Sequence, residues 1–477
     1  MADYSETSLK SVPFKVTDPE RIPAKRYYDE EFYRLENERL WPHVWQMACR
    51  TEQIPNIGDW IEYSNLGKSV IVVRTPEGIK AYSNACRHRG VQLAAGHGNC
   101  EKKGFTCPFH GWHWNMNGEN SFVYGRPLFT EHQLDQADLA LPHVRAEEAV
   151  GCVFINFDDG APSVRESMGS VIDNLEAHNL HTARAEWWYQ TELPSNWKLA
   201  MEAFQEALHV MRTHPQLFAV GEMFFGPRYN LPRDPQAASK MRDVRADQHA
   251  EKMTVPDPRE FIDVYLDYLQ VISEGMAGMC HAKDVATARS IADAEIPGEP
   301  AMAIPTWLGM LNEAVTRDGR ARGENTPDLN VVSRTNPVSS VEFLFPHTFF
   351  LPTLSSFSAY RIRPTGPETC IFEIWSLTQF PEGQEPDPVM TPTILPYDSP
   401  EFPEIPQQDY ANIPLQQRGL HAPGFEFMRL STETEGMISN YHRIIDAYLA
   451  GEKTSRIAPA VHKLALNFDG PVLELEL

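Results

Sequence analysis

Short stretches of alternating apolar and polar residues dominate residues 46–155. They read WQMACR, DWIEYS, SVIVVRT, IKAYSN and GCVFINF, and turn sequences such as Pro55-Asn56 separate them. Alternation with a period of two is typical of strands that bury one face, and short strands joined by turns favour antiparallel pairing. The pattern predicts a small antiparallel β domain that ends near residues 158–162, where the sequence DDGAP interrupts it.

Longer periodic segments follow and mix helices with strands. Residues 196–213, residues 258–280 and the stretch SNYHRIIDAYLAG predict helices, with Ser195 or Asn196 as the N-cap of the first. The stretches VEFLFPHTFFLPTL, SAYRIRP and TCIFEIWSLTQF predict an antiparallel sheet. We therefore expect an α+β fold: a helical arm at 1–45 packing on the larger domain, the β domain at 46–155, and the larger domain at 156–477 with a helical insertion or lid at about 230–335.

Composition narrows the class of protein. A chain of 477 residues suggests two domains, and 42% hydrophobic with 10% aromatic residues describes a soluble globular protein. The chain has no apolar run long enough to span a membrane, and its start lacks an apolar signal core, so we expect a cytoplasmic protein. Five of the seven cysteines are scattered with no pairing pattern, which suits a reducing compartment: Cys49, Cys100, Cys152, Cys280 and Cys370. A net charge of −23 argues against a nucleic-acid partner.

Two Cys-His pairs carry the strongest chemical signal. Cys86-x-His88 lies in NACRHRG, and Cys107-x-x-His110 lies in CPFHGWHW. A [2Fe–2S] cluster with two thiolates on one iron and two imidazoles on the other needs such mixed pairs. Zinc is the rival metal, but zinc fingers usually pair Cys with Cys and His with His. The pairs predict a one-electron relay, and the motifs resemble those of the Rieske family.

A second candidate metal site follows in the segment NWKLAMEAFQEALHVMRTHP. His209 and His214 are ~140° apart on a continuous helix at ~3.6 residues per turn, too far round to share a metal. Pro215 disfavours helical backbone at His214, so the chain can turn there and bring the two imidazoles together. With a distant carboxylate they would form the two-His-one-carboxylate site of non-haem Fe(II) oxygenases.

With both motifs in this order, the chain resembles the large (α) subunits of Rieske non-haem iron ring-hydroxylating oxygenases. The resemblance covers residues 40–225 and 340–445, and implies a catalytic domain of the START or helix-grip type. It implies Asp409, eight residues before Gln417, as the third iron ligand. It also implies that Glu206 links a cluster histidine of a neighbouring subunit to an iron histidine. The expected electron path is His110 of one subunit, Glu206 of the next, then His209 and the iron.

The resemblance also implies partners. No GxGxxG sequence follows a predicted strand, so NAD(P)H is expected to act through a separate reductase, with or without a ferredoxin. A basic patch of Arg87, Arg89, Lys102 and Lys103 is a candidate docking surface for that donor, with ordinary surface solvation as the alternative. The expected assembly is a homotrimer, with or without a small β subunit.

The expected reaction uses O2 to hydroxylate an aromatic or alicyclic substrate, with cis-dihydroxylation as the main interpretation. Monooxygenation or oxidative demethylation is the alternative, and a non-enzymatic iron–sulfur electron carrier is the alternative of another class. The helix at 258–280, with Met276 and Met279, is expected to roof the pocket. Residues near the ligands in sequence are pocket candidates, with core packing as the alternative: Phe204, Leu208, Val210, Met211, Phe218 and Val220.

Overall fold

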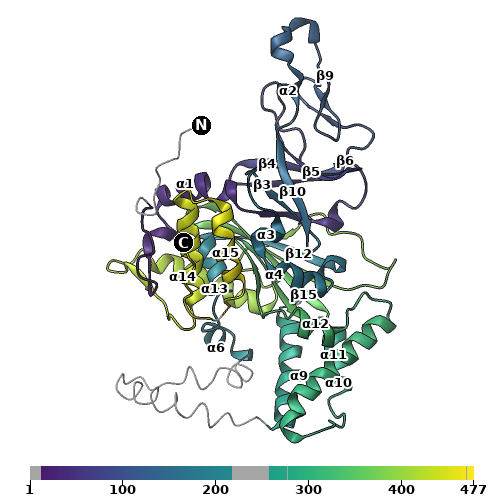
Figure 1. The fold of residues 1–477 in the computed structure, drawn as a ribbon, viewed down its shortest axis with the longest axis vertical. Coiled ribbons are helices and arrows are strands. Elements are labelled where there is room, and N and C mark those ends of the chain that lie inside the picture. The colour runs from purple at the N-terminus through teal and green to yellow at the C-terminus, as the bar shows by residue number, and fades with distance from the viewer. Residues whose placement is uncertain (1–11, 218–256, 277, 469) are drawn as a thin grey trace.

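The computed structural model describes residues 12–217, 257–276, 278–468 and 470–477. A β domain lies at one end of the long axis, a larger domain with its own sheet lies in the middle, and a helical lobe projects at the other end (Figure 1). The predicted α+β class is therefore confirmed. Among the described residues, no helix has the length and apolar character that crossing a membrane would need.

The β domain is built on one seven-stranded sheet whose neighbouring strands are antiparallel. The strand predictions for this part of the chain are confirmed. In sheet order the strands are β2 (Gln46–Arg50), β11 (Cys152–Asn156), β10 (His143–Ala149), β5 (Gly78–Ser83), β4 (Lys68–Thr75), β3 (Asp59–Asn65) and β6 (His97–Asn99). A small second sheet holds β7 (Phe105–Thr106), β8 (His113–Trp114) and β9 (Asn120–Phe122). Helix α2 (Gln136–Leu139) precedes β10.

The larger domain has a six-stranded sheet in which only the short edge strand β17 runs parallel to its neighbour. The sheet order is β13 (Glu342–Leu344), β14 (Thr348–Thr353), β15 (Ser356–Gly366), β16 (Thr369–Thr378), β12 (Arg184–Leu193) and β17 (Thr393–Ile394). The predicted strands between residues 341 and 380 are all present. The accompanying helices are α3 (Val164–Met168), α4 (Ser170–Ala177), α5 (Trp197–Glu202), α13 (Glu404–Gly419), α14 (Gly436–Leu449) and α15 (Thr454–Ala465).

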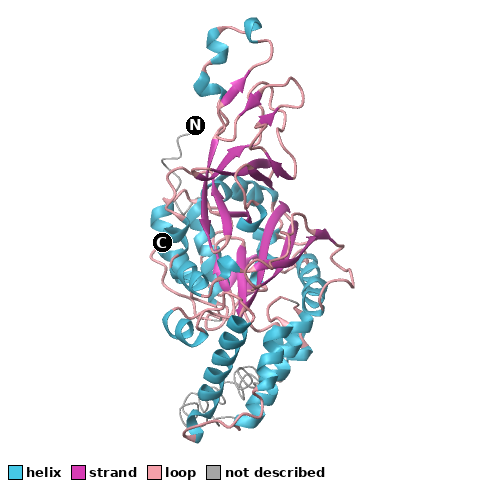
Figure 2. Ribbon diagram, turned by 90° about the vertical axis from the view of Figure 1, so that its right-hand side faces the viewer, coloured by secondary structure: helices cyan, strands magenta, loops and turns pink. Residues whose placement is uncertain are grey.

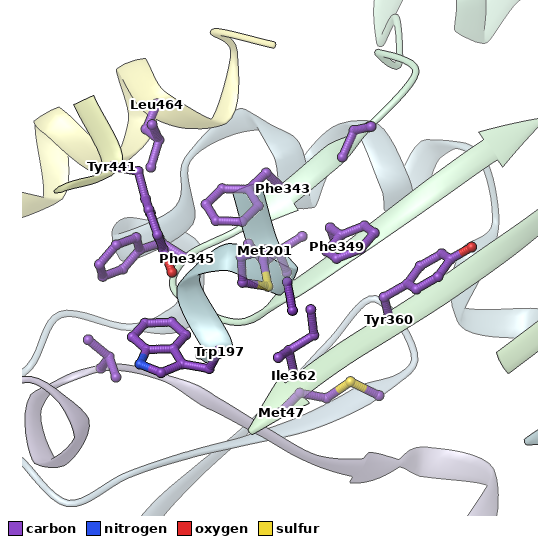
Figure 3. Packing of buried hydrophobic residues seen from close by; sticks show 14 of the residues in the cluster. Met47, Trp197, Met201, Phe343, Phe345, Phe349, Tyr360, Ile362, Tyr441 and Leu464 are labelled. Carbon is purple, nitrogen blue, oxygen red and sulfur yellow. The ribbon is translucent and has the colours of Figure 1, made fainter. Parts of the chain in front are cut away.

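The main core lies between this sheet and the helices that cover it. Figure 3 shows Trp197 and Met201 of α5 between the strands and the C-terminal helices, with Phe349 and Ile362 on the sheet side and Tyr441 on the helix side. All five side chains are fully buried. Burial of apolar surface on this scale is the main stabilising contribution to such a domain, and it fixes α5, the helix that leads into the histidine segment.

The N-terminal arm, described from residue 12, lies against the larger domain. Strand β1 (Arg21–Pro23) pairs with β18 (Phe427–Arg429), and helix α1 (Glu30–Arg39) packs near α14. The arm is also anchored by a buried ion pair of 2.6 Å between Arg26 and Asp446. The arm therefore contributes side chains to the interior of the larger domain.

The helical lobe consists of α9 (Pro258–Gly275), α10 (Ala282–Ser290), α11 (Ala303–Ala321) and α12 (Leu329–Thr335). It has its own hydrophobic core, in which Trp307 and Leu269 are fully buried, and Figure 2 shows it extending beyond the sheets. The predicted helix at 258–280 ends earlier, at Gly275. Residues 230–256 of the predicted insertion lie outside the described part of the chain.

The two sheets are joined by a buried arginine. Arg361 of β15 donates hydrogen bonds to the backbone carbonyls of Met47 (3.0 Å) and Ala48 (2.7 Å) in the β domain. Its guanidinium forms two 2.7 Å contacts with the carboxylate of Glu373, which also binds Arg363. Burial alone would raise the pKa of Glu373, but the charges and hydrogen bonds of Arg361 and Arg363 outweigh it, so the pKa of Glu373 is lowered. The junction is thus a charge-assisted network with satisfied partners.

We expect Arg361→Ala to destabilise the protein by about 3–5 kcal/mol, because it removes one partner of a buried pair and leaves Glu373 and two carbonyls with fewer donors. The free energy of unfolding in urea measures this. Arg34→Ala, which breaks an exposed pair with Glu31 and Glu38, is the matched control and should change stability little. Equal effects of the two substitutions would contradict the assignment.

Candidate functional site

The two Cys-His loops have the same backbone shape. The N–H of Cys86 donates to the carbonyl of Val91 (2.8 Å), and the N–H of Gly90 donates to the carbonyl of Cys86 (2.9 Å). Twenty-one positions later, Cys107 donates to Trp112 (2.8 Å) and Gly111 donates to Cys107 (3.0 Å). Both glycines have positive φ, 77° and 70°, a conformation that other residues rarely adopt. Each glycine therefore closes a tight loop around its cysteine.

The side chains of these loops converge. The Cys86 and Cys107 thiols are buried, and each affects the pKa of the other, while the rings of His88 and His110 lie 4.7 Å apart between centroids. Burial raises the pKa of Cys86. At Cys107 the same burial is outweighed by the backbone N–H groups of His110 and Phe109, which lower its pKa.

One buried atom in this cluster lacks a partner. Nδ1 of His88 has no hydrogen bond among the described residues, and the ring stacks on Trp112 at 4.7 Å. A buried imidazole nitrogen normally has a hydrogen bond or a metal. Two inner thiols and two outer imidazoles, one with an unpartnered nitrogen, fit a cluster with two thiolate and two imidazole ligands.

The segment that contains the second site does not form the single helix that was predicted over 196–213. Helix α5 begins after the predicted N-cap Asn196, whose side chain accepts the N–H of Lys198, and ends at Glu202. A separate turn of helix, α6, spans Val210–Thr213. Between them the Glu206 carboxylate accepts the backbone N–H groups of Leu208 and of His209 (3.1 Å). These bonds replace helical ones, as short-range bonds from a side chain to the backbone do.

The break brings together the three residues expected to bind iron. Nε2 of His214 lies 3.2 Å from Oδ1 of Asp409, and Nε2 of His209 lies 3.9 Å from the same oxygen. One ligand atom from each residue falls within 4.8 Å of the others. His214 has non-helical backbone, φ −115° and ψ 76°, as expected before Pro215. Two imidazole nitrogens and a carboxylate are the donor set of non-haem Fe(II) sites.

Both histidines are held by their other nitrogen. Nδ1 of His209 is 2.6 Å from Glu206, and Nδ1 of His214 is 2.6 Å from the side-chain oxygen of Gln408. Although burial alone would lower it, the hydrogen bond and charge of Glu206 raise the pKa of His209. Such contacts fix the ring orientation and leave Nε2 free for a metal. Gln408, which Gln216 holds in turn, was not predicted from the sequence; its position next to Asp409 was the available signal.

A cavity of about 350 Å³ opens beside His209 and Asp409. Four of its lining side chains are acidic, and one, Arg429, is basic. The lining residues are Glu202, Ala203, Glu206, His209, Thr213, Asp409, Asn412, Ile413, Gln416, Phe425, Met428, Arg429, Leu430, Glu435 and Ile438. The cavity is therefore a negatively charged approach to the three residues of the candidate iron site.

The pocket candidates from the sequence are not among these lining residues. Phe204 packs against Phe349 (4.4 Å between ring centroids) and Tyr360 (5.1 Å) in the core, which agrees with the core-packing alternative. Leu208 and Val210 are partly buried. Phe218 and Val220 lie outside the described residues, as does the side chain of Met211. Met276, at the end of α9, is buried beside the Tyr360 hydroxyl (4.0 Å), so it too lies in the core; Met279 is partly buried.

The surface around the Cys-His loops combines cations with exposed apolar groups. Arg87 donates to the carbonyl of Asp138 (2.7 Å), Arg89 lies over the ring of Phe109 (5.7 Å), and Lys102 and Lys103 are exposed. Exposed large apolar side chains nearby in sequence are Phe109, Phe122, Tyr124 and Leu128. In Figure 1, β9 lies near one end of the long axis, and α6 lies on the far side of the larger domain. The two candidate centres of one chain are thus well separated.

Two family models match the chain. Residues 44–123 match the Rieske [2Fe-2S] domain, and residues 178–451 match the ring hydroxylating alpha subunit (catalytic domain). The first match decides between the two metals weighed for the Cys-His pairs, in favour of the iron–sulfur cluster.

Curated relatives include both monooxygenases and dioxygenases. The chain is 31% identical over 197 residues to the carnitine monooxygenase oxygenase subunit of Escherichia coli K12, a match over 41% of this chain and 52% of that protein. It is 34% identical over 205 residues to the large oxygenase component of the naphthalene 1,2-dioxygenase system of Pseudomonas aeruginosa, over 41% and 45%. The chain thus spans about half the length of the curated relatives it matches.

Solved structures share the fold over most of the chain. A quaternary ammonium Rieske monooxygenase is 15% identical, with a TM-score of 0.56 over 91% of this chain and 97% of that one. Naphthalene 1,2-dioxygenase with bound indole is 18% identical, with a TM-score of 0.60 over 93% and 96%. Because the catalytic-domain model covers more than half of the sequence, the chain belongs to the family of ring-hydroxylating oxygenase alpha subunits, with a Rieske [2Fe–2S] domain before the catalytic domain.

Proposed function

We propose that this chain is the terminal oxygenase component of a multicomponent system, which uses O2 and electrons from NAD(P)H, delivered by a separate reductase, to hydroxylate an organic substrate. The observation that carries the proposal is the meeting of His209, His214 and Asp409 within 4.8 Å, in a chain that also carries a Rieske domain. A cluster alone relays electrons, whereas a second, open iron site gives them an acceptor.

The ligand assignments follow from the two sites. Cys86 and Cys107 would hold one iron of the cluster, and His88 and His110 the other. His209, His214 and Asp409 would hold the mononuclear Fe(II), and iron bound there supplies the chemistry that activates O2. Three protein ligands would leave coordination positions open for O2 and substrate. Glu206 and Gln408 keep the two imidazoles oriented.

Electron transfer between subunits is the proposed role of Glu206. Within one chain the two centres are far apart (Figure 1), while Glu206 faces the cavity and touches His209 at 2.6 Å. The acidic cavity and the basic, apolar surface around His110 are complementary, as docking of a second copy requires. A solved relative of this fold is described as revealing inter-subunit electron transfer. The proposed assembly is a homotrimer, with or without a small β subunit.

The relatives support two candidate substrate classes. Naphthalene dioxygenase relatives favour an aromatic or alicyclic substrate and a cis-diol product. Carnitine and glycine betaine monooxygenase relatives favour a quaternary ammonium substrate, and the acidic side chains of Glu206 and Asp409 in the cavity suit a cation.

Aerobic turnover under 18O2 with a surrogate reductase tests the function and separates the classes. The panel contains aromatic acids, polycyclic hydrocarbons, terpenoid acids, carnitine and glycine betaine. Two labelled oxygen atoms in one product indicate dioxygenation, and one indicates monooxygenation. O2 uptake and product absent with every compound, from protein with both centres loaded, would contradict the oxygenase proposal and favour the electron carrier.

A further inference from the structure

Glu202 is a buried acid beside the candidate iron site, and the roles proposed above for the iron ligands, Glu206 and Gln408 do not involve it. It is the last residue of α5, only 5% exposed, and it lines the cavity together with Glu206, His209 and Asp409. Its nearest contacts come from elements far away in the sequence. The side chain therefore connects the cavity with the interior of the domain.

The interior side of Glu202 is held by two donors. The Tyr27 hydroxyl donates to Oε1 (2.9 Å), and Nε2 of His442 lies 2.7 Å from the same oxygen. Nδ1 of His442 accepts a hydrogen bond from Arg26 (3.1 Å), so the proton of this ring is on Nε2, where it can donate to Glu202. Oε2 has no hydrogen bond among the described residues and is the oxygen left to face the cavity.

The two buried cations near Glu202 already have other carboxylates as ion-pair partners. Arg26 is paired with Asp446 at 2.6 Å, and Lys198 is paired with Glu36 at 2.8 Å, both buried. Burial raises the pKa of Glu202 to about 8, against the lowering effects of the Tyr27 hydrogen bond and of the charges of Lys198 and Arg26. Burial also lowers the pKa of His442 well below its ordinary value, so that ring is neutral. Burial thus favours the protonated form of Glu202.

The groups that face Glu202 come from three elements. Within the described part of the chain they are Arg26 and Tyr27 of the 3-10 helix Ala24–Tyr27, Lys198 of α5, Tyr441 and His442 of α14, and Glu435 at the start of α14. Glu435 also lines the cavity, and its negative charge favours the protonated form of Glu202. Burial raises the pKa of Glu435 as well, but Glu202 is the cavity-lining acid whose pKa is raised to about 8 and whose other oxygen is held by Tyr27 and His442.

We propose that Glu202 is the group that delivers protons to the cavity beside the iron site. The proposal rests on the proposed function, because hydroxylation by O2 consumes two electrons and two protons per turnover, whether one oxygen atom enters the substrate or both. In each transfer the O–H bond at Oε2 breaks, and the proton passes through cavity water to the reacting oxygen. Tyr27 and His442 stabilise the carboxylate left behind, which regains a proton from cavity water.

Three variants test the role. Glu202→Gln keeps the size of the side chain but has no acidic proton, and Glu202→Asp keeps the acid. Glu342→Gln is the matched control, because Glu342 is also a buried carboxyl, with a pKa raised by burial to about 7, but does not line the cavity. Infrared titration of the isolated proteins measures the carbonyl band of the protonated acid. Turnover with the surrogate reductase measures the rate of product formation, together with the pH profile and the solvent isotope effect of that rate.

We expect a carboxylic acid band that titrates near pH 8 in the wild type and in E342Q and is missing from E202Q. E202Q should form product roughly 10²-fold more slowly or worse, the usual contribution of a positioned acid. In the wild type, product formation should fall as the pH rises through about 8, because the acid form is lost; E202Q should lack this limb.

The proposal is overturned if E202Q keeps the infrared band, or if its rate and pH profile equal those of E342Q. Should E202Q lose iron, E202D decides: product formation within roughly 10-fold of the wild type supports the role of the acid, and a loss as large as that of E202Q contradicts it. If the wild type oxygenates no substrate, the proposed function fails, while the infrared titration still shows whether Glu202 holds the proton.

Discussion

Replacing Asp409 with Ala is expected to abolish product formation and leave the Rieske cluster intact. Without its carboxylate the site keeps only His209 and His214, and two neutral imidazoles hold Fe(II) weakly. Iron content should fall from about three to about two atoms per chain, because the cluster keeps its own ligands. The measurements are metal analysis, the visible spectrum of the cluster, and product formation with the surrogate reductase.

Glu404→Ala serves as the control, since it removes an exposed carboxylate from the same helix, α13. It should retain iron, colour and activity. Product formed by D409A at the rate of E404A would exclude Asp409 as a ligand and leave the electron-carrier interpretation of the chain standing.

Glu206→Gln is expected to slow electron transfer from cluster to iron by about 10- to 100-fold, the usual effect of removing a group that orients a metal-bound histidine. The amide oxygen can still accept both backbone N–H groups, which bind one oxygen of Glu206, so the loop should keep its shape, but the negative charge beside Nδ1 of His209 is lost. Stopped-flow absorbance of the reduced cluster, mixed with O2 and substrate in a single turnover, measures the rate.

A second carboxylate–imidazole pair provides the control for this experiment. Glu368 lies 2.6 Å from His421 and does not line the cavity. Glu368→Gln should therefore leave cluster oxidation at the wild-type rate. If E206Q and E368Q oxidised equally fast, electrons would have to reach the iron by a route that does not involve Glu206.

The sequence located the two candidate centres because their signals are local. The Cys-His loops are short, and their glycines and mixed ligand pairs are visible without the fold. Pro215 indicated the turn at His214, which the structure contains. Asp409, by contrast, came from the family resemblance, because spacing alone did not separate it from the other acidic residues of the C-terminal third.

The sequence pattern failed where side chains compete with the backbone or act over long distances. The apolar period of residues 196–213 favours a single helix, but the Glu206 carboxylate takes the N–H groups that a helix would use. The partners of Glu202 are 175 and 240 positions away in the chain, at Tyr27 and His442. No local period encodes such contacts, so this buried network could be found only in the folded chain.

The junction at Arg361 has a consequence for recombination between relatives. On the β-domain side its acceptors are the backbone carbonyls of Met47 and Ala48. Any other residue at these two positions would supply the same carbonyl. The two side chains of the ion pair, Arg361 and Glu373, belong to the catalytic sheet, while the ring of Tyr63 from the β domain lies 5.5 Å from the guanidinium. A chimera that carries a Rieske domain from another oxygenase should therefore keep these two hydrogen bonds whatever residues stand at positions 47 and 48, because Arg361 makes no demand on those side chains.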